Sequence, residues 1–200
     1  HRVRVRDAAS GTIRHELALP ERPFVVTIDP AATRVAAGTI GGTAVVLDLA
    51  TGAPVGRPRI GHAGAVTAVA FDPSGSLLTA DLAGSVRRWT LDATSHVPVE
   101  LAHDGAVTDL AFTEDGRLHT LSLADGRRTW ASPGAGPVAA AAPAGVSPDT
   151  WRLQPLPGGG VAEGTVDGRV VVRRDAAATE VAGMAGGQVQ SMAVSPDGTR

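Results

Sequence analysis

The chain has 200 residues, of which 18 are basic and 20 acidic, so its formal net charge is −2 and bulk charge gives no attraction to nucleic acid or an anionic membrane. The 25 glycines and 14 prolines indicate many turns, while a hydrophobic content of 43% is too high for a disordered chain. Cysteine is absent, which excludes disulfides, thiolate metal sites and cysteine nucleophiles. No run of eighteen apolar residues occurs, so we expect a soluble protein without a transmembrane helix.

A turn motif of the type Asp-Pro-x-Gly recurs along the whole chain. Its second position falls at residues 30, 73, 114, 157 and 196, which gives spacings of 43, 41, 43 and 39 residues. The residue that closes a later β-like run keeps nearly the same period, at Asp7, Asp48, Thr90, Ala131 and Arg174. Two separate features with one period indicate a repeat architecture.

Each repeat has the pattern of four short strands. In residues 61–101 these are Val66–Phe71, Ser76–Ala80, Ser85–Thr90 and Val97–Leu101, with an Asp-Pro-Ser-Gly turn after the first. The connections are too short for the crossover that parallel strands require, so each unit is predicted to be an antiparallel meander. Four-stranded units of about forty residues that stack radially form a β-propeller. The predicted fold is therefore an all-β propeller.

Along the chain, this pattern predicts strands at 2–7 and 12–19 in a partial blade 1–20, four blades at 22–60, 61–101, 102–142 and 143–183, and a partial blade 184–200. The inner strands are expected at 24–28, 66–71, 107–112, 151–156 and 189–194. Residues 135–144 are the best helical stretch, but Gly136, Pro137 and Pro143 interrupt it, so we expect the fourth strand of that blade there.

Strands 2–7 and 12–19 are the outer half of a blade whose inner strand we place at 189–194, and its second strand is missing. At about 41 residues per blade, a seven-blade ring needs roughly 290 residues. The chain starts with His1 and stops just after a turn motif, so both ends look cut. We therefore expect an incomplete arc of about four whole blades with exposed edges, without pairing between residues 1–7 and 189–200.

Two units carry a family resemblance. Gly61-His62 is followed by the run Val66 to Gly75 and by Trp89, and the next unit repeats this order with His103, a run from Val107 to Phe112, and Trp130. The chain resembles tryptophan-aspartate (WD) repeat proteins, and the match in register covers essentially its whole length. No unit contains the Trp-Asp pair itself, so the resemblance is to a degenerate member.

In that family, a His, a hydroxyl residue, an Asp and a Trp form a buried hydrogen-bonded tetrad. The resemblance implies one such structural tetrad here, made by His103, Thr120, Asp125 and Trp130. In the preceding unit Ala83 stands in the Asp place, so we expect His62, Thr79 and Trp89 to lack a carboxylate.

Few residues suggest chemistry. His62 and His103 lie 41 residues apart, which is the repeat period, so we interpret them as structural rather than catalytic or metal-binding. Asp109 is the one acidic residue in the predicted inner strands, where enzymatic propellers gather acids or histidines. Glycine runs at 158–160 and 183–187 lack a phosphate-binding ending. No cofactor or metal site is predicted.

Arginine pairs recur in or near the third strand, at Arg87-Arg88, Arg127-Arg128 and Arg173-Arg174, with Arg2, Arg4 and Arg6 in the equivalent strand at the start. They suggest a basic stripe for nucleic acid. Without interleaved aromatic residues for base stacking, we interpret them as a solvated sheet face.

The resemblance implies a non-catalytic scaffold or sensor that binds a protein or peptide partner. It further implies a cytoplasmic, bacterial signalling protein to which an NTPase or kinase domain is fused. Two alternatives stay open: a propeller hydrolase or lactonase, and nucleic-acid binding through the third-strand arginines. A cluster of inner-strand carboxylates would indicate the enzyme, and binding that weakens steeply with salt would indicate nucleic-acid binding.

The turns between second and third strands have apolar residues at equivalent tips, namely Ile40, Leu82, Leu123 and Val166. Such side chains are unexpected on solvated tips. We interpret them as a partner-binding rim, with packing between blades as the alternative.

Overall fold

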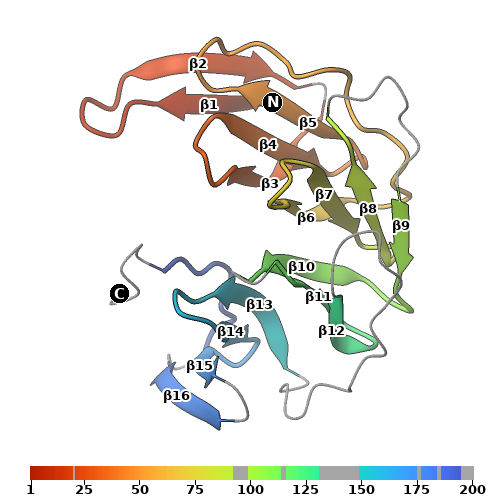
Figure 1. Cartoon of the computed structure of the whole chain (residues 1–200), viewed down its shortest axis with the longest axis vertical. Helices are drawn as coiled ribbons and strands as arrows, with labels where there is room; N and C mark the ends of the chain where they lie inside the picture. Colours follow the sequence, from red (N-terminus) through yellow and green to blue (C-terminus); the bar gives the residue numbers. More distant parts are fainter. Residues whose placement is uncertain are drawn as a thin grey trace. The chain divides into compact units, whose positions relative to one another are not determined.

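The structure is a computed structural model that describes residues 1–19, 21–91, 99–113, 116–130, 149–174, 177–183 and 186–194 (Figure 1). Within these ranges the chain forms sixteen strands in five separate antiparallel sheets and no helix. The chain divides into two compact units, His1–Ala102 and His103–Arg200, which are described one at a time. The predicted all-β architecture of antiparallel meanders is confirmed.

Unit 1 contains three sheets. β1 (Arg2–Arg6) pairs with β2 (Ile13–Ala18), and the next sheet joins β3 (Pro23–Ile28), β4 (Arg34–Thr39) and β5 (Ala44–Asp48) in sequence order. Isolated β-bridges join Leu47 to Pro54 and Ala44 to Arg59, so the segment after β5 runs along the outer edge of that strand. The last sheet is a complete four-stranded meander of β6 (Val66–Phe71), β7 (Leu77–Asp81), β8 (Ser85–Trp89) and β9 (Val99–Ala102).

Unit 2 repeats the pattern. Its first sheet contains β10 (Val107–Phe112), β11 (Leu118–Ser122) and β12 (Gly126–Trp130), and its second contains β13 (Thr150–Pro155), β14 (Val161–Thr165), β15 (Arg169–Arg174) and β16 (Ala177–Gly183). The strand predicted at 135–144 lies outside the described residues. The inner strand predicted at 189–194 is not a strand, although the Val189 amide donates to the Thr165 carbonyl at 3.0 Å.

The recurring aspartate explains the tight turns between first and second strands. Oδ1 of Asp72 accepts hydrogen bonds from the amides of Ser74 and Ser76 at 2.8 and 2.9 Å, and Gly75 follows with φ of 81°. Asp29 accepts from the Thr33 and Arg34 amides in the same way. Because Asp closes its own turn and Gly accepts positive φ freely, this motif forces the chain back antiparallel.

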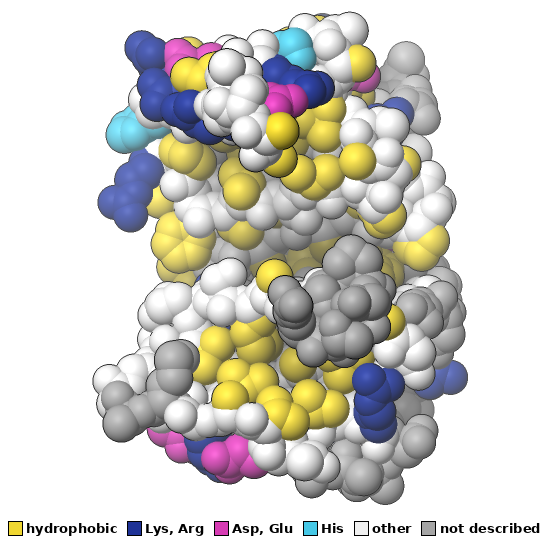
Figure 2. All heavy atoms as spheres, turned by 90° about the vertical axis from the view of Figure 1, so that its left-hand side faces the viewer, with side chains coloured by type: hydrophobic (Ala, Val, Ile, Leu, Met, Phe, Trp, Pro, Cys, Tyr) yellow, Lys and Arg dark blue, Asp and Glu magenta, His cyan; other side chains and the backbone are white. Residues whose placement is uncertain are grey.

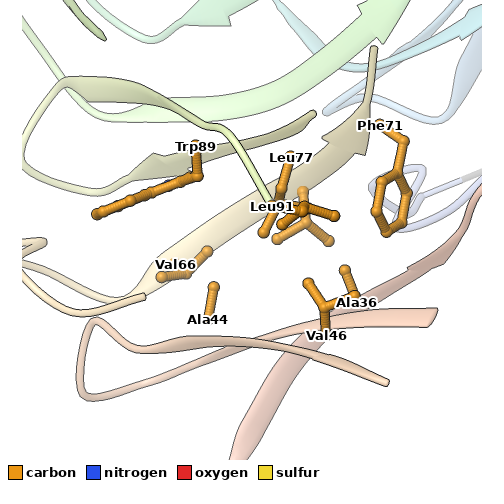
Figure 3. Close-up of a cluster of buried hydrophobic side chains, with 9 residues drawn as sticks. Ala36, Ala44, Val46, Val66, Phe71, Leu77, Trp89 and Leu91 are labelled. Atoms are coloured by element: carbon orange, nitrogen blue, oxygen red, sulfur yellow. The ribbon is translucent and has the colours of Figure 1, made fainter. Parts of the chain in front are cut away.

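The main core of unit 1 lies between neighbouring blades. Val66, Val69, Phe71 and Leu77 of the β6–β9 blade pack with Ala36, Ala44 and Val46 of β4 and β5, together with Trp89 and Leu91 (Figure 3). A Cβ on Gly38 would lie 2.8 Å from Val66 Cβ, so only glycine permits this approach. Each meander therefore buries its face against the next blade, as the repeat predicts.

The same interface recurs elsewhere in each unit. Val3 and Leu19 pack on Ala37, so the two-stranded β1–β2 sheet covers the outer part of the β3–β5 sheet. In unit 2, Leu153 of β13 packs against Ala111 and Leu121 of β10 and β11. A Cβ on Gly164 would lie 2.6 Å from Val189 Cγ1, which repeats the Gly38–Val66 approach.

Candidate functional site

A buried tetrad joins the loop before β6 to β7 and β8. Nε2 of His62 lies 2.5 Å from Thr79 Oγ1, and the Trp89 indole N–H donates to the same oxygen at 2.8 Å. Nδ1 of His62 lies 2.9 Å from Asp81 Oδ2, and both side chains are fully buried. The prediction that this unit lacks a carboxylate is therefore wrong: Asp81 at the end of β7 supplies it, and Ala83 does not occupy the decisive position.

The donors and acceptors in this tetrad fix the state of the imidazole. Because the indole N–H can only donate, the Thr79 hydroxyl uses its own hydrogen toward His62 Nε2. Nδ1 then carries the proton and donates to Asp81. Burial lowers the pKa of His62 below its ordinary value despite the opposing effect of the Asp81 hydrogen bond, so the ring is neutral. This arrangement satisfies every member without a ligand.

Unit 2 holds a second tetrad from the residues predicted. His103 Nδ1 lies 2.8 Å from Asp125 Oδ2, His103 Nε2 lies 2.8 Å from Thr120 Oγ1, and the Trp130 indole donates to that hydroxyl at 3.0 Å. Here the carboxylate comes from the far side of the turn. Ser122 stands where the other blade has Asp81, and its hydroxyl donates to Asp125 Oδ1 at 2.6 Å.

In the last blade, charged side chains occupy the positions of the tetrad. Glu163 occupies the position of Thr79, and Arg173 that of Trp89. The Glu163 side chain is fully buried, and its Oε2 accepts from Arg173 Nε at 2.8 Å. Arg127 of the preceding blade lies 3.6 Å from Oε1 of the same carboxylate. Two arginines therefore share one buried carboxylate across a blade interface, which the repeat pattern does not predict.

The four predicted rim residues are solvent-exposed tips. Their exposed fractions are 48% for Ile40, 50% for Leu82, 58% for Leu123 and 43% for Val166. Ile40 and Leu82 belong to unit 1, and Leu123 and Val166 to unit 2. These side chains do not tuck between blades.

Two of these tips, Leu82 and Leu123, are fixed by the polar interior beneath them. Asp81 Oδ1 accepts from the amides of Ala83 and Ser85 at 3.0 and 2.8 Å, and the Leu82 amide donates to Ala65 at 3.2 Å. In unit 2 the Leu123 amide donates to the Ala106 carbonyl at 2.9 Å. The tetrads thus tie two loops together and present an apolar side chain on a preorganised turn.

The WD domain, G-beta repeat family matches residues 55–90, which includes the His62 tetrad. Residues 55–90 therefore match a WD repeat, and the fold of the chain is that of a β-propeller. Among solved structures, the β-propeller domain of Cps50 (Swd1) from Myceliophteria thermophila is similar with a TM-score of 0.65 and 16% sequence identity, over 90% of this chain and 61% of that one. This chain thus spans less than two thirds of that propeller. Comparison with curated protein sequences finds no match.

Most of the third-strand arginines form ion pairs. Arg88 Nε lies 2.8 Å from Asp72, Arg128 lies 2.7 Å from Asp125, and Arg87 lies 3.6 Å from Glu100. At the N-terminus, Arg2 and Arg4 both contact Glu16 at 2.5 Å. Carboxylates therefore accompany most of the arginines that recur as a stripe in the sequence, whereas Arg6 and Arg174 donate to backbone carbonyls.

Asp109 links the inner strands of two neighbouring blades. Its Oδ2 accepts from the Leu153 amide of β13 at 2.8 Å, and its Oδ1 accepts from the Leu110 amide at 2.9 Å. Burial raises the pKa of Asp109 to about 6. Arg152 donates to the carbonyls of Thr108 and Gln190 at 2.8 and 2.9 Å. Both side chains are engaged with backbone.

In the described ranges, no three His, Cys, Asp or Glu residues lie close enough together to hold a metal ion. The described part of the chain also has no helix long and apolar enough to cross a bilayer.

Proposed function

We propose that this chain is a non-catalytic scaffold whose exposed turn tips bind a protein or peptide partner. WD-repeat propellers typically mediate protein–protein interaction. The observation that carries the proposal is the pairing of exposed apolar tips with a rigid base: Leu82 is half exposed, while the tetrad that holds its turn is buried. Apolar anchors on a fixed backbone bind with little loss of conformational entropy.

Two further features support a scaffold over the alternatives. Asp109, the one acid in the predicted inner strands, is half-buried and accepts two backbone hydrogen bonds, which is a structural arrangement rather than that of an exposed acid or base. Most third-strand arginines have carboxylate partners, which weakens a phosphate-binding role. Location in the cytoplasm and fusion to an NTPase or kinase domain remain parts of the proposal.

A peptide selection tests the proposal and needs no identified partner. Peptides from a random displayed library are selected against the wild-type chain, and the enriched sequences are then measured against Leu82→Asp and Leu123→Asp variants. We expect enriched peptides with apolar anchors and at least tenfold weaker binding to the variant at the tip they use. Val181→Asp, at an exposed valine in β16 outside the turns, is the control. Equal binding to all variants would rule out the rim.

A further inference from the structure

One arginine of unit 1 is almost completely buried. Arg59 is 2% exposed and lies in the segment that follows β5, where a β-bridge joins it to Ala44. The Arg59 amide donates to the Ala44 carbonyl at 2.7 Å, and the Ala44 amide donates to the Arg59 carbonyl at 2.8 Å. Residues directly opposite each other in an antiparallel pair share a face. The Arg59 side chain therefore leaves the sheet on the face where Ala44 packs into the core (Figure 3).

The fold does not require a charge at this position. The strand register of the two four-stranded blades aligns Arg59 with Leu101 of β9 and Ala182 of β16. Both of these residues are apolar, so the fourth strand of a blade pairs with the third without a cation there. Burial lowers the pKa of the Arg59 guanidinium, because a charged group loses its hydration in the interior. A costly cation at a position that accepts Leu or Ala indicates a binding role.

Other arginines of unit 1 lie at the surface beside carboxylates. Figure 2 shows arginine and acidic side chains together at the surface of the β1–β2 sheet, where Arg2 and Arg4 contact Glu16. At Arg59 the described part of the chain supplies no such partner: Nη1 donates to the Arg57 carbonyl, while Nε and Nη2 are buried without a hydrogen-bond partner. Buried donors in folded proteins are almost always hydrogen-bonded. These two donors therefore point to a bound acceptor.

The two unpaired donors of Arg59 lie on one edge of its guanidinium. Nη2 lies trans to Cδ, so one of its N–H bonds is parallel to the Nε–H bond, and such an edge binds two oxygens of a carboxylate or a phosphate. Nη1 lies on the other side and already donates to Arg57. A carboxylate fits better than a phosphate, because its single negative charge neutralises one buried guanidinium, whereas a phosphate dianion leaves a net buried charge.

An exposed bend lies over the end of the guanidinium. Gly56, Arg57 and Pro58 are exposed, and a Cβ on Gly56 would lie 3.4 Å from Nη2 and 3.5 Å from Nη1. The β-bridges at Pro54 and Arg59 hold the segment to β5 on either side of this bend. The exposed Arg57 adds a second positive charge, which attracts an anion to the same place.

We propose that the Nε–Nη2 edge of Arg59 binds a carboxylate, which enters when the bend at residues 56–58 opens. An aspartate or glutamate side chain in a partner segment and a small carboxylic acid share this chemistry. The site lies on the fourth-strand segment of its blade, is separate from the rim tips, and does not depend on the proposed function.

Side-chain NMR of the arginines tests the proposal on the wild-type chain. The Arg59 Nε–H resonance is assigned by its absence from Arg59→Lys, and it is followed while acetate replaces chloride at constant ionic strength. We expect a saturable shift with acetate. A shift with the end-blocked peptide Gly-Asp-Gly, and none with Gly-Asn-Gly, would show that the site admits an acidic protein segment, whereas a response to acetate alone would assign it to small acids. No response to either carboxylate, or a response to inorganic phosphate alone, would overturn the proposal.

Thermal unfolding of variants gives a second measurement. Arg59→Met should be at least as stable as wild type in chloride, because apolar residues occupy the equivalent positions of β9 and β16. Acetate should raise the thermal midpoint of wild type and leave that of Arg59→Met unchanged, since a ligand stabilises only the state that binds it. Arg59→Lys keeps the charge but loses the two-donor edge, so its affinity for acetate should fall at least tenfold. Arg57→Met, at the exposed neighbouring arginine, is the matched control and should change that affinity by no more than about twofold. An equal effect of acetate on wild type and Arg59→Met would refute the assignment.

Discussion

Asp81 contacts His62 with one carboxylate oxygen and the backbone of its own turn with the other. The Oδ2–Nδ1 distance is 2.9 Å, and both side chains have no exposed surface. A single buried carboxylate therefore connects the loop before β6, the strand β7 and the exposed tip at Leu82. The stability of the blade and the geometry of the rim depend on the same group.

Removal of this carboxylate should be costly. Asp81→Ala leaves the His62 Nδ1–H and two amides without an acceptor, and we expect a loss of about 2–4 kcal/mol in the free energy of unfolding. Asp125→Ala should cost less, because the Asp125 side chain is 14% exposed and water can replace it. Asp104→Ala, at a side chain that is 87% exposed, is the control and should change little. Chemical denaturation measures all three, and an Asp81 loss as small as that of Asp104 would contradict the tetrad assignment.

The sequence predicts the fold well and the tetrads only in part. The period of the turn motif and the Trp positions identify the strands, because these features are local. Counting residues within the turn misplaces the carboxylate partner of His62, because the acid can reach the imidazole from either end of the turn. Asp81 approaches from the end of β7 and Asp125 from beyond the Ser122–Leu123 tip. Only the folded turn shows which carboxylate lies near the imidazole.

The charged blade shows a different limit of prediction. Glu163 and Arg173 occupy the positions of a hydroxyl residue and a tryptophan, so comparison with the other units fails there. The useful signal is the simultaneous change of both positions to opposite charges. Opposite charges at diagonal positions on adjacent strands, which long side chains can bridge, predict an ion pair. Its burial, and the addition of Arg127 from the preceding sheet, follow from blade stacking rather than from local sequence.

The two buried histidines should make stability fall in mild acid. Burial lowers the pKa of His62 and His103 in the folded chain, while the unfolded value is 6.5. Below pH 6.5 the unfolded state binds protons more readily, so their stabilising contribution is present above that pH and is lost as the pH falls through it. We expect denaturation midpoints to decrease from pH 7.5 to 5.5. A His62→Gln, His103→Gln variant should show a smaller decrease; the same decrease would contradict this account.

Asp109 should have the opposite effect on the pH dependence of stability. Its folded pKa is raised by burial to about 6 from 3.8, so the folded state binds the proton more tightly, and Asp109 adds stability as the pH falls through 6. Asp109→Asn removes the buried charge but keeps only one of two accepted hydrogen bonds. We expect a gain of about 1–2 kcal/mol at pH 7 that disappears near pH 5. Unfolding curves at the two pH values provide the check, and a pH-independent effect would refute it.

Close approach between blades should depend on glycine. Gly38→Ala places a Cβ within 3.0 Å of Val66 and Val25 atoms, so the blades must separate. Overpacking of this kind costs about 1–3 kcal/mol. Gly187→Ala is the matched control, because no heavy atom lies within 4 Å of its added Cβ and no positive φ is required there. Equal thermal midpoints for the two variants would show that the interface yields without cost.

The charged residues at the ion pair of the last blade can be replaced by the residue types found at the same positions of other blades. Glu163→Ala leaves the partly buried Arg127 and Arg173 without a carboxylate, and we expect a loss of about 3 kcal/mol in the free energy of unfolding. The triple variant Glu163→Thr, Arg173→Trp, Arg127→Val introduces the residue types found at Thr79, Trp89 and Val86, which are buried at the corresponding positions of unit 1. Because buried ion pairs contribute little relative to well-packed apolar groups, this triple variant should be as stable as wild type or more stable. Chemical denaturation of the single and triple variants decides the matter. If the triple variant is as unstable as Glu163→Ala, the charged set is specific to this blade and does not stand in for the tetrad.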